Sequence, residues 1–532
     1  MKKLKQNNAI TLVALIITII VLIILAGVTL NIVLGNNGII NKAKQAKQNM
    51  TNASDEEKEW LSEAEGVIES IEETPITNGS WSEVKGVNSP KLDGTGLKGI
   101  KLSNNGTYEE IKDGQANWYS YTENDKRWAN AKTQDGSMWV WIPRYAYKIT
   151  YTNPSDKSLG GTIDIVFLKN DTTLDKNGND VTQSTYVNEK GEQGAYIVHP
   201  CFKDGTSNGF TNGEWDDEIE GIWVAKFEAG FSGGNNSVEK VSSGLTYGEN
   251  SPSKNFYGPI TVGSTPIYYP VFMPKTYSYN YITISDMYSL SKSLNYSGNP
   301  YGLVTEKIDS HMIKNSEWGA VTYLTHSKYG RNKEEISINN VNLNGTVDTI
   351  CAVTGMSSGT TNSAQIKTTV EAINNGTSGS YSWETANGQK ASTTGNIYGI
   401  YDLSGGSWEN TAAYISDGEI SKYGKNIESD GQNNTKYKNV YSYNTSNTNS
   451  GNNYNANTSK IGEAIWETST SGAGDKPTSW NQDNSSFVNS TGAFSARGGH
   501  YDRNTSAGIF AFGYTNGVGG YMNGFRAVLI PM

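Results

Sequence analysis

With 532 residues, the chain is long enough for more than one domain. Its formal net charge of −10 argues against a nucleic-acid-binding surface, and few charged residues (18%) with abundant glycine and tyrosine are typical of an exported, loop-rich β protein. The two cysteines, Cys201 and Cys351, are too few for a disulfide-stapled scaffold or a cysteine-rich metal site; one bridge outside the cell and two buried free thiols are both compatible with the sequence.

The amino-terminal segment has the pattern of a membrane anchor. Basic residues precede an uncharged run from Ala9 to Leu34, which as a helix is about 39 Å long and therefore long enough to cross a bilayer. The basic flank predicts that the bulk of the chain lies outside the cell. Because helix formers continue after the run, we expect one long helix over residues 10–73, half in the membrane and half outside it.

The stretch "AITLVALIITII" resembles the amino terminus of type IV prepilins, in which a short basic leader meets an apolar helix. The resemblance implies a leader over residues 1–9, cleavage by prepilin peptidase between Ala9 and Ile10, and methylation of Ile10. The family's glycine before the cut is Ala9 here, and its glutamate five residues after the cut is Ala14. That carboxylate normally offsets the new amino charge of a neighbouring subunit, so assembly with other pilin subunits stays open. A plain signal anchor is the alternative.

The next part of the chain reads as strands and turns. Residues 74–136 alternate polar and apolar residues between Gly, Asn and Pro, which predicts a small β region or a linker. Two strands are expected in "SMWVWIPRYAYKI" and in residues 220–231. The polar insertion between them contains "DKNGND", which is faintly similar to a calcium loop, although its glycine is misplaced for an EF-hand.

Two amphipathic helices are expected further along the chain, over residues 283–295 and 311–330. A later stretch, residues 429–459, is nearly free of aliphatic side chains. Such a composition predicts either a disordered loop or a surface insertion.

Several blocks over residues 137–532 resemble the formylglycine-generating-enzyme group. These blocks are "IWVAKFEAG", "MIKNSEWGAV", "NIYGIYDLSGGSWENT", "ARGGHY" and "GFRAVL". The resemblance implies a C-type-lectin-like head with polar loop insertions. The expected fold class is therefore α+β, with a long N-terminal transmembrane, pilin-like helix followed by this head.

The residues that catalytic members of the group need are missing from the sequence. The oxidases hold copper on a cysteine pair near the carboxyl end, and no cysteine follows Cys351. The iron-dependent relatives use three histidines, and the four histidines here (His199, His311, His326 and His500) have no ligand spacing. We therefore expect no catalytic residue, no metal and no cofactor, with a divergent oxidase as an alternative.

The carboxyl-terminal segment, residues 495–532, resembles the end of variable proteins that retroelements diversify. Such ends read Arg-Gly-Gly, a varied run, Ala-Gly-x-Phe-Ala, a second varied run, then Gly-Phe-Arg. Together with the resemblance to the formylglycine-generating-enzyme group, this ending implies a structural frame of Trp408, Glu409, Arg497, Gly498, Gly499, Gly524, Phe525 and Arg526. It implies ligand-binding residues at His500, Tyr501, Asp502, Arg503, Asn504, Thr505, Tyr514, Thr515, Asn516, Tyr521 and Asn523. Tyrosine suits this role because it offers a large, stiff contact area with few torsions to freeze.

Together these patterns favour a cell-surface, pilin-like adhesion or receptor protein that is anchored in the cell membrane and has an extracellular head. Whether it is part of a pilus stays open. Its expected partners are the membrane, prepilin peptidase, other pilin subunits and a protein, glycan, phage or host-surface ligand, but no nucleic acid. A structural pilin subunit without a dedicated ligand is the second alternative. We expect Phe525 and Arg526 to stabilise the fold, and Tyr501, Tyr514 and Tyr521 to lie at the surface.

Overall fold

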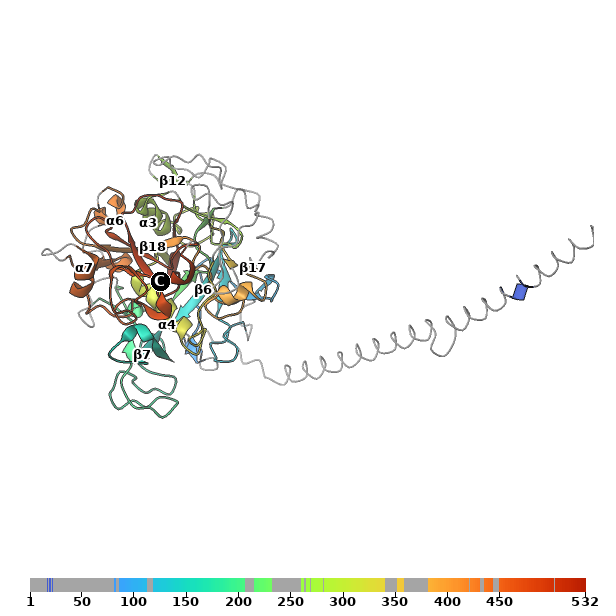
Figure 1. Cartoon of the computed structure of the whole chain (residues 1–532), viewed down its shortest axis with the longest axis horizontal. Helices are drawn as coiled ribbons and strands as arrows, with labels where there is room; N and C mark the ends of the chain where they lie inside the picture. The colour runs from blue at the N-terminus through green and yellow to red at the C-terminus, as the bar shows by residue number, and fades with distance from the viewer. Residues whose placement is uncertain are drawn as a thin grey trace, which may run out of the picture. The chain divides into compact units, whose positions relative to one another are not determined.

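The computed structural model (Figure 1) divides into two compact units, Met1–Thr74 and Pro75–Met532. It describes residues 17, 19, 20, 22, 81–82, 86–111, 118–205, 215–231, 260–262, 265–267, 269–280, 282–339, 352–357, 381–420, 422–430, 435–443, 449–501 and 503–532. Of the expected 10–73 helix, only Ile17, Ile19, Ile20 and Leu22 are therefore described, each in helical conformation. The expected cleavage site at Ala9 and Ile10 lies outside the described residues.

The predicted fold class, α+β with a long transmembrane helix, is wrong. The described residues form mainly β-strands and four short helices, α3 (Ile284–Lys292), α4 (Asn315–His326), α6 (Lys425–Ser429) and α7 (Ser450–Ala456). None of the helices in this described part is long and apolar enough to cross a membrane. The physical reason is that apolar residues of the second unit come in short runs between turns, which favours strands over helices.

The first large sheet has seven strands and a fully apolar centre. Its order is β15 (Ile308–Met312), β25 (Ala527–Pro531), β10 (Gly221–Ala225), β6 (Met138–Pro143), β5 (Asn130–Lys132), β3 (Lys98–Leu102) and β4 (Tyr108–Glu110). Each pair is antiparallel. All side chains of β6 are buried, because its continuous apolar run is covered on both faces. Strands β3, β4 and β5 fall in the region expected to be a small β region or a linker, and β5 pairs directly with β6.

The second large sheet carries the carboxyl-terminal segment. It contains β19 (Asn439–Tyr441), β18 (Trp408–Ile415), β22 (Phe494–Arg497), β23 (Phe512–Thr515), β21 (Ser485–Ser486) and β20 (Ala473–Lys476) in that order, and β24 (Asn523–Phe525) pairs in parallel with the start of β18. The chain then passes from β24 into β25 of the first sheet. One residue, Arg526, thus connects the two sheets.

A third sheet, β8 (Gly161–Phe167), β7 (Tyr145–Tyr151) and β9 (Ile197–Val198), supports the polar insertion. Four two-stranded sheets complete the described β structure: β1 (Trp81–Ser82) with β2 (Val87–Asn88), β11 (Gly230–Phe231) with β14 (Tyr277–Ser278), β12 (Ile260–Val262) with β13 (Thr265–Ile267), and β16 (Met356–Ser357) with β17 (Tyr381–Ser382). Short 3-10 helices span Lys157–Leu159, Pro200–Phe202, Gly388–Ala391, Thr435–Tyr437, Trp480–Gln482 and Asn504–Ser506.

The expected strands and helices are shorter than predicted. The stretch "SMWVWIPRYAYKI" gives two strands, β6 and β7, and residues 220–231 give β10 and β11. The helix expected over 283–295 is α3, but the one expected over 311–330 splits into the end of β15 and α4. The split falls at Lys314, whose backbone N–H donates to Glu317 Oε2 at 2.8 Å and so begins the helix there.

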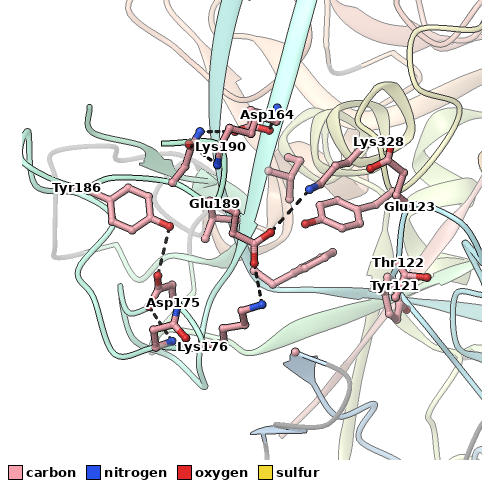
Figure 2. Close-up of a pocket in the computed structure, with 17 residues that line it drawn as sticks. Tyr121, Thr122, Glu123, Asp164, Asp175, Lys176, Tyr186, Glu189, Lys190 and Lys328 are labelled. Atoms are coloured by element: carbon pink, nitrogen blue, oxygen red, sulfur yellow. Dashed lines mark hydrogen bonds and ion pairs between the residues drawn. The ribbon is translucent and has the colours of Figure 1, made fainter. Parts of the chain in front are cut away.

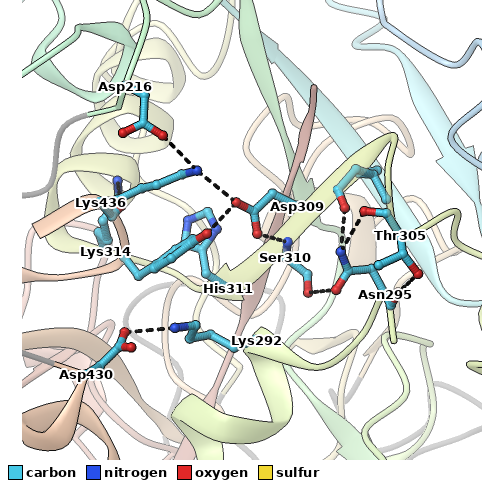
Figure 3. Close-up of polar contacts among 12 residues, drawn as sticks. Asp216, Lys292, Asn295, Thr305, Asp309, Ser310, His311, Lys314, Asp430 and Lys436 are labelled. Atoms are coloured by element: carbon cyan, nitrogen blue, oxygen red, sulfur yellow. Dashed lines mark hydrogen bonds and ion pairs between the residues drawn. The ribbon is translucent and has the colours of Figure 1, made fainter. Parts of the chain in front are cut away.

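Residues 429–459, expected as a disordered loop or an insertion, contribute β19 and α7 to the head. Ion pairs and tyrosines replace the missing aliphatic side chains. Lys436 contacts Asp216 at 3.2 Å and Asp309 at 3.3 Å, and Asp430 pairs with Lys292 of α3 at 2.8 Å (Figure 3). The stretch 431–434 and the stretch 444–448 lie outside the described residues.

Candidate functional site

Arg526 is fully buried where the two large sheets meet, and its hydrogen bonds join them. Its Nε donates to Glu409 Oε2 at 2.9 Å, and its Nη2 donates to the other oxygen of the same carboxylate. The remaining donors reach the carbonyls of Ala225 on β10 at 2.6 Å and of Tyr401 at 2.7 Å. Because every guanidinium nitrogen has an acceptor, this buried cation is both paired and hydrogen-bonded.

Two further carboxyl groups, Glu228 and Asp402, lie in the same buried cluster as Glu409. Burial raises the pKa of Asp402 to about 6 and that of Glu409 to about 7, and burial together with Asp402 raises the pKa of Glu228 well above its usual range. Asp402 accepts from the Gly355 N–H at 2.8 Å and from Asn339 Nδ2 at 3.0 Å, which favours its charged form. Since one guanidinium faces three carboxyl groups, we assign the retained proton to Glu228.

The Arg-Gly-Gly block forms the second part of the frame. Arg497 lies opposite Glu409 in the β18–β22 pairing, and its guanidinium donates to the carbonyls of Glu463 at 2.9 Å and Ala464 at 3.1 Å. Gly498 and Gly499 have φ of 83° and 76°, a region that favours glycine. A Cβ on Gly499 would also lie 2.6 Å from the Cβ of Ala507. The frame positions Trp408, Phe525 and Gly524 are buried as well.

The structure places His500 and Tyr501 in the interior, which corrects the expectation that both are surface contacts. Their exposed fractions are 5% and 2%. After the two glycines the chain folds back, so that the Tyr501 N–H donates to the Gly406 carbonyl at 2.8 Å. The His500 ring lies 6.3 Å from that of Trp408, and burial lowers the pKa of His500 to about 3, which keeps the imidazole neutral at physiological pH.

Tyr514 is the most exposed aromatic residue of the predicted binding set, with 46% of its surface accessible. It lies on β23, directly opposite Ser495 of β22. Its ring covers Gly492, where an added Cβ would lie 2.0 Å from Tyr514 Cδ2. Glycine at 492 thus leaves room for the ring to lie against the sheet.

The other predicted contacts surround this tyrosine in the sequence but differ in exposure. Thr505 and Asn516 are exposed, whereas Arg503, Thr515, Tyr521 and Asn523 are partly buried. Asn504 begins the 3-10 helix Asn504–Ser506, and Asp502 lies outside the described residues. We use the name contact surface for Arg503, Thr505, Tyr514, Thr515, Asn516, Tyr521 and Asn523.

Arg503 links this contact surface to the frame. Its Nε lies 3.2 Å from His500 Nε2, and its guanidinium lies 5.9 Å from the centre of the Trp408 indole. It also approaches Asp475 of β20 at 3.6 Å. The Arg503 side chain therefore packs against the buried His500 imidazole and the Trp408 indole.

The four histidines do not form a metal site. His311 Nε2 lies 2.7 Å from Glu317 Oε1, whereas His199 and His326 are buried among other aromatic rings. In the described part of the chain, no group of three or more His, Cys, Asp or Glu side chains is arranged to hold a metal ion. Cys201 is a buried free thiol, and Cys351 lies outside that part.

The "DKNGND" loop is held by its own backbone. Asp175 Oδ1 accepts from the N–H groups of Asn177 at 2.9 Å and Asn179 at 2.8 Å, and its Oδ2 faces the Tyr186 hydroxyl at 3.3 Å. This is the pattern of an Asx turn, in which the side chain replaces a backbone acceptor. The loop lies beside a pocket, shown in Figure 2, that sequence reasoning did not predict.

Comparison of the chain with protein-family models gives no match, and comparison with curated proteins gives none. The resemblances to type IV prepilins, to the formylglycine-generating-enzyme group and to retroelement-diversified proteins thus stay predictions from the sequence.

Proposed function

We propose that this protein is a cell-surface adhesion or receptor protein that binds its ligand through the contact surface. The observation that carries the proposal is a difference in burial between the frame residues and Tyr514 within the carboxyl-terminal segment. Arg497, Phe525 and Arg526 are fully buried, whereas Tyr514 projects from the same sheet with nearly half of its surface accessible. A tyrosine presented on a strand supplies the large, stiff contact area that binding surfaces favour.

The contact surface suits a ligand that is recognised by apolar contact and hydrogen bonds. Thr505, Tyr514 and Asn516 are neutral, and the charge of Arg503 is partly offset by Asp475 at 3.6 Å. The amino-terminal resemblance to prepilins supports display outside the cell membrane after cleavage between Ala9 and Ile10. Recognition of a protein, a glycan or a phage surface is compatible with this chemistry.

The test compares two tyrosines of similar exposure. Purified full-length protein is immobilised and challenged with fluorescently labelled bacterial cells and with phage particles. Tyr514→Ala should weaken capture by about fivefold or more, as expected for an anchor residue that loses about 1 kcal/mol or more. Tyr108→Ala is the matched control, because Tyr108 has an exposed fraction of 42% and lies on β4 of the other sheet. Equal capture by the two variants, with thermal stability unchanged in both, would contradict the proposal.

A further inference from the structure

The polar insertion between β8 and β9 forms one wall of a pocket of about 280 Å³ (Figure 2). Three other segments and Gly86 complete it: the segments are the turn 121–123, the end of β8 at residues 164–167, and residues 328–329 just after α4. None of the lining residues belongs to the contact surface or to the frame. The pocket is therefore a second candidate binding site, independent of the one around Tyr514.

The wall contributed by the insertion is held in place by side-chain hydrogen bonds and a small apolar core. In addition to the turn at Asp175, Asn188 Oδ1 accepts from the N–H groups of Lys190 at 3.0 Å and Glu192 at 2.9 Å. The core beneath these turns consists of Ala146, Leu168, Val181, Tyr186, Tyr196 and Val198. A pocket whose walls are already formed loses little conformational freedom when a ligand enters it.

Most charged groups of the pocket are already paired with one another. Glu189 lies 2.7 Å from Lys176 and 3.9 Å from Lys328, and Asp164 lies 2.9 Å from Lys190. The hydrogen bond to Lys176 lowers the pKa of Glu189, so this carboxylate is ionised at neutral pH. An ionic ligand would have to displace one of these pairs, whereas a neutral ligand can bind beside them.

Glu123 and Tyr329 each present a polar group of the pocket to a ligand. The Glu123 carboxylate makes no hydrogen bond or ion pair with the described residues, and the Tyr329 hydroxyl has no hydrogen-bond partner among them either. Glu123 is labelled at the pocket in Figure 2, and Tyr329, which also lines it, directly follows Lys328 in the sequence. One is a pure acceptor, and the other both donates and accepts.

We propose that this pocket binds a neutral saccharide. Sugar hydroxyls both donate and accept, so they can satisfy the Glu123 carboxylate, the Tyr329 hydroxyl and the Lys328 ammonium without breaking an ion pair. Tyr329 is partly exposed, but its ring lies 4.8 Å from that of Phe167 and has the Lys328 ammonium 5.1 Å from its centre, so the sugar is recognised here through hydrogen bonds. The volume of about 280 Å³ lies just below the range of pockets for drug-sized ligands, so it suits one or two sugar units.

The experiment uses the full-length protein on an array of immobilised neutral, sialylated and sulfated glycans, followed by calorimetric titration with the neutral sugars captured. Tyr329→Phe and Glu123→Gln should each weaken binding about threefold to tenfold, the loss expected for one hydrogen bond. Tyr108→Phe and Glu109→Gln, on the exposed strand β4, are the matched controls and should bind as the parent does.

Binding should also change little between 0.05 and about 0.5 M salt, because no net charge is transferred to the pocket. Absence of neutral-glycan binding would overturn the proposal, as would binding that the two pocket variants leave unchanged. Capture of sialylated or sulfated glycans alone, with steep loss in salt, would show instead that the ligand is ionic.

Discussion

Glu409 and Glu228 lie in one buried cluster, yet replacing each by glutamine should give opposite results. Glu409 is the ion-pair partner of Arg526, from which it accepts two hydrogen bonds. Glu228 faces Asp402, and its pKa lies well above the usual range because of burial and that neighbouring charge. We expect Glu409→Gln to be strongly destabilising and Glu228→Gln to be nearly neutral.

The magnitude follows from what each substitution leaves behind. In Glu409→Gln the amide keeps one acceptor but turns an N–H group toward the guanidinium, so Arg526 loses its counter-charge and one of its acceptors. Removing one partner of a buried ion pair costs about 3–5 kcal/mol. In Glu228→Gln a protonated carboxyl is replaced by a neutral amide of similar shape, so the free energy of unfolding should change by less than about 1 kcal/mol.

The assay is equilibrium unfolding of the full chain in urea at pH 7, followed by the fluorescence of its 13 tryptophans. Glu109→Gln, on the exposed strand β4, controls for loss of a surface charge. Equal destabilisation by the two cluster variants would refute the assignment of the proton to Glu228. A loss below about 1 kcal/mol for Glu409→Gln would refute the view that its ion pair with Arg526 holds the two sheets together.

Three other outcomes are expected. Because burial and the neighbouring Asp402 charge raise the folded-state pKa of Glu228 well above its usual range, the folded chain keeps a proton that the unfolded chain releases, and the free energy of unfolding should fall as the pH is raised above about 4 in a urea series. Tyr501→Ala should cost about 3–5 kcal/mol because its ring is buried, whereas Tyr514→Ala should stay within about 0.5 kcal/mol, as paired thermal melts would show. If the chain is processed as prepilins are, amino-terminal sequencing of the protein isolated from its native cells should begin at Ile10; a start at Met1 would contradict this processing.

How well the sequence predicts whether a residue is buried depends on the type of residue. The motifs of the carboxyl-terminal segment predict structural roles for Arg497, Phe525 and Arg526, and all three are buried in the structure. A cationic residue within an apolar strand pattern is conspicuous in a sequence, because such a charge is rarely buried without a partner. The partner itself, Glu409, lies 117 residues away, and only the resemblance linked the two.

For tyrosine and histidine, the sequence is a poorer guide to whether the side chain is buried or exposed. His500 and Tyr501 follow the glycine pair at once and have the same composition as exposed loop residues, yet the backbone turn directs them inward. Tyrosine also forms much of the core here: Tyr441 and Tyr454 pack with Trp466 and account for order in a stretch that lacks aliphatic residues. A side chain with an apolar ring and a polar tip suits either place, so its type alone does not decide.

The pocket beside β8 could not be predicted because it is assembled from distant segments. The Glu123 carboxylate and the Tyr329 hydroxyl are more than 200 residues apart in the sequence, and the insertion supplies one wall. The turn residues of "DKNGND" are visible in the sequence, but the backbone N–H groups that Asp175 accepts from lie within the loop itself. Only the packing of the insertion against β8 shows which side chains share one cavity.

The pairing of strands separates Tyr514 of the contact surface from the frame. Glu409 of β18 lies opposite Arg497 of β22, and Arg497 in turn lies opposite Phe512 of β23. Tyr514 comes two residues after Phe512, so it lies on the same face of β23 but beyond the buried cluster, on a strand whose position the backbone hydrogen bonds of β22 already fix. We therefore expect a substitution at Tyr514 to leave the Arg526–Glu409 pair, which joins the sheets, unchanged.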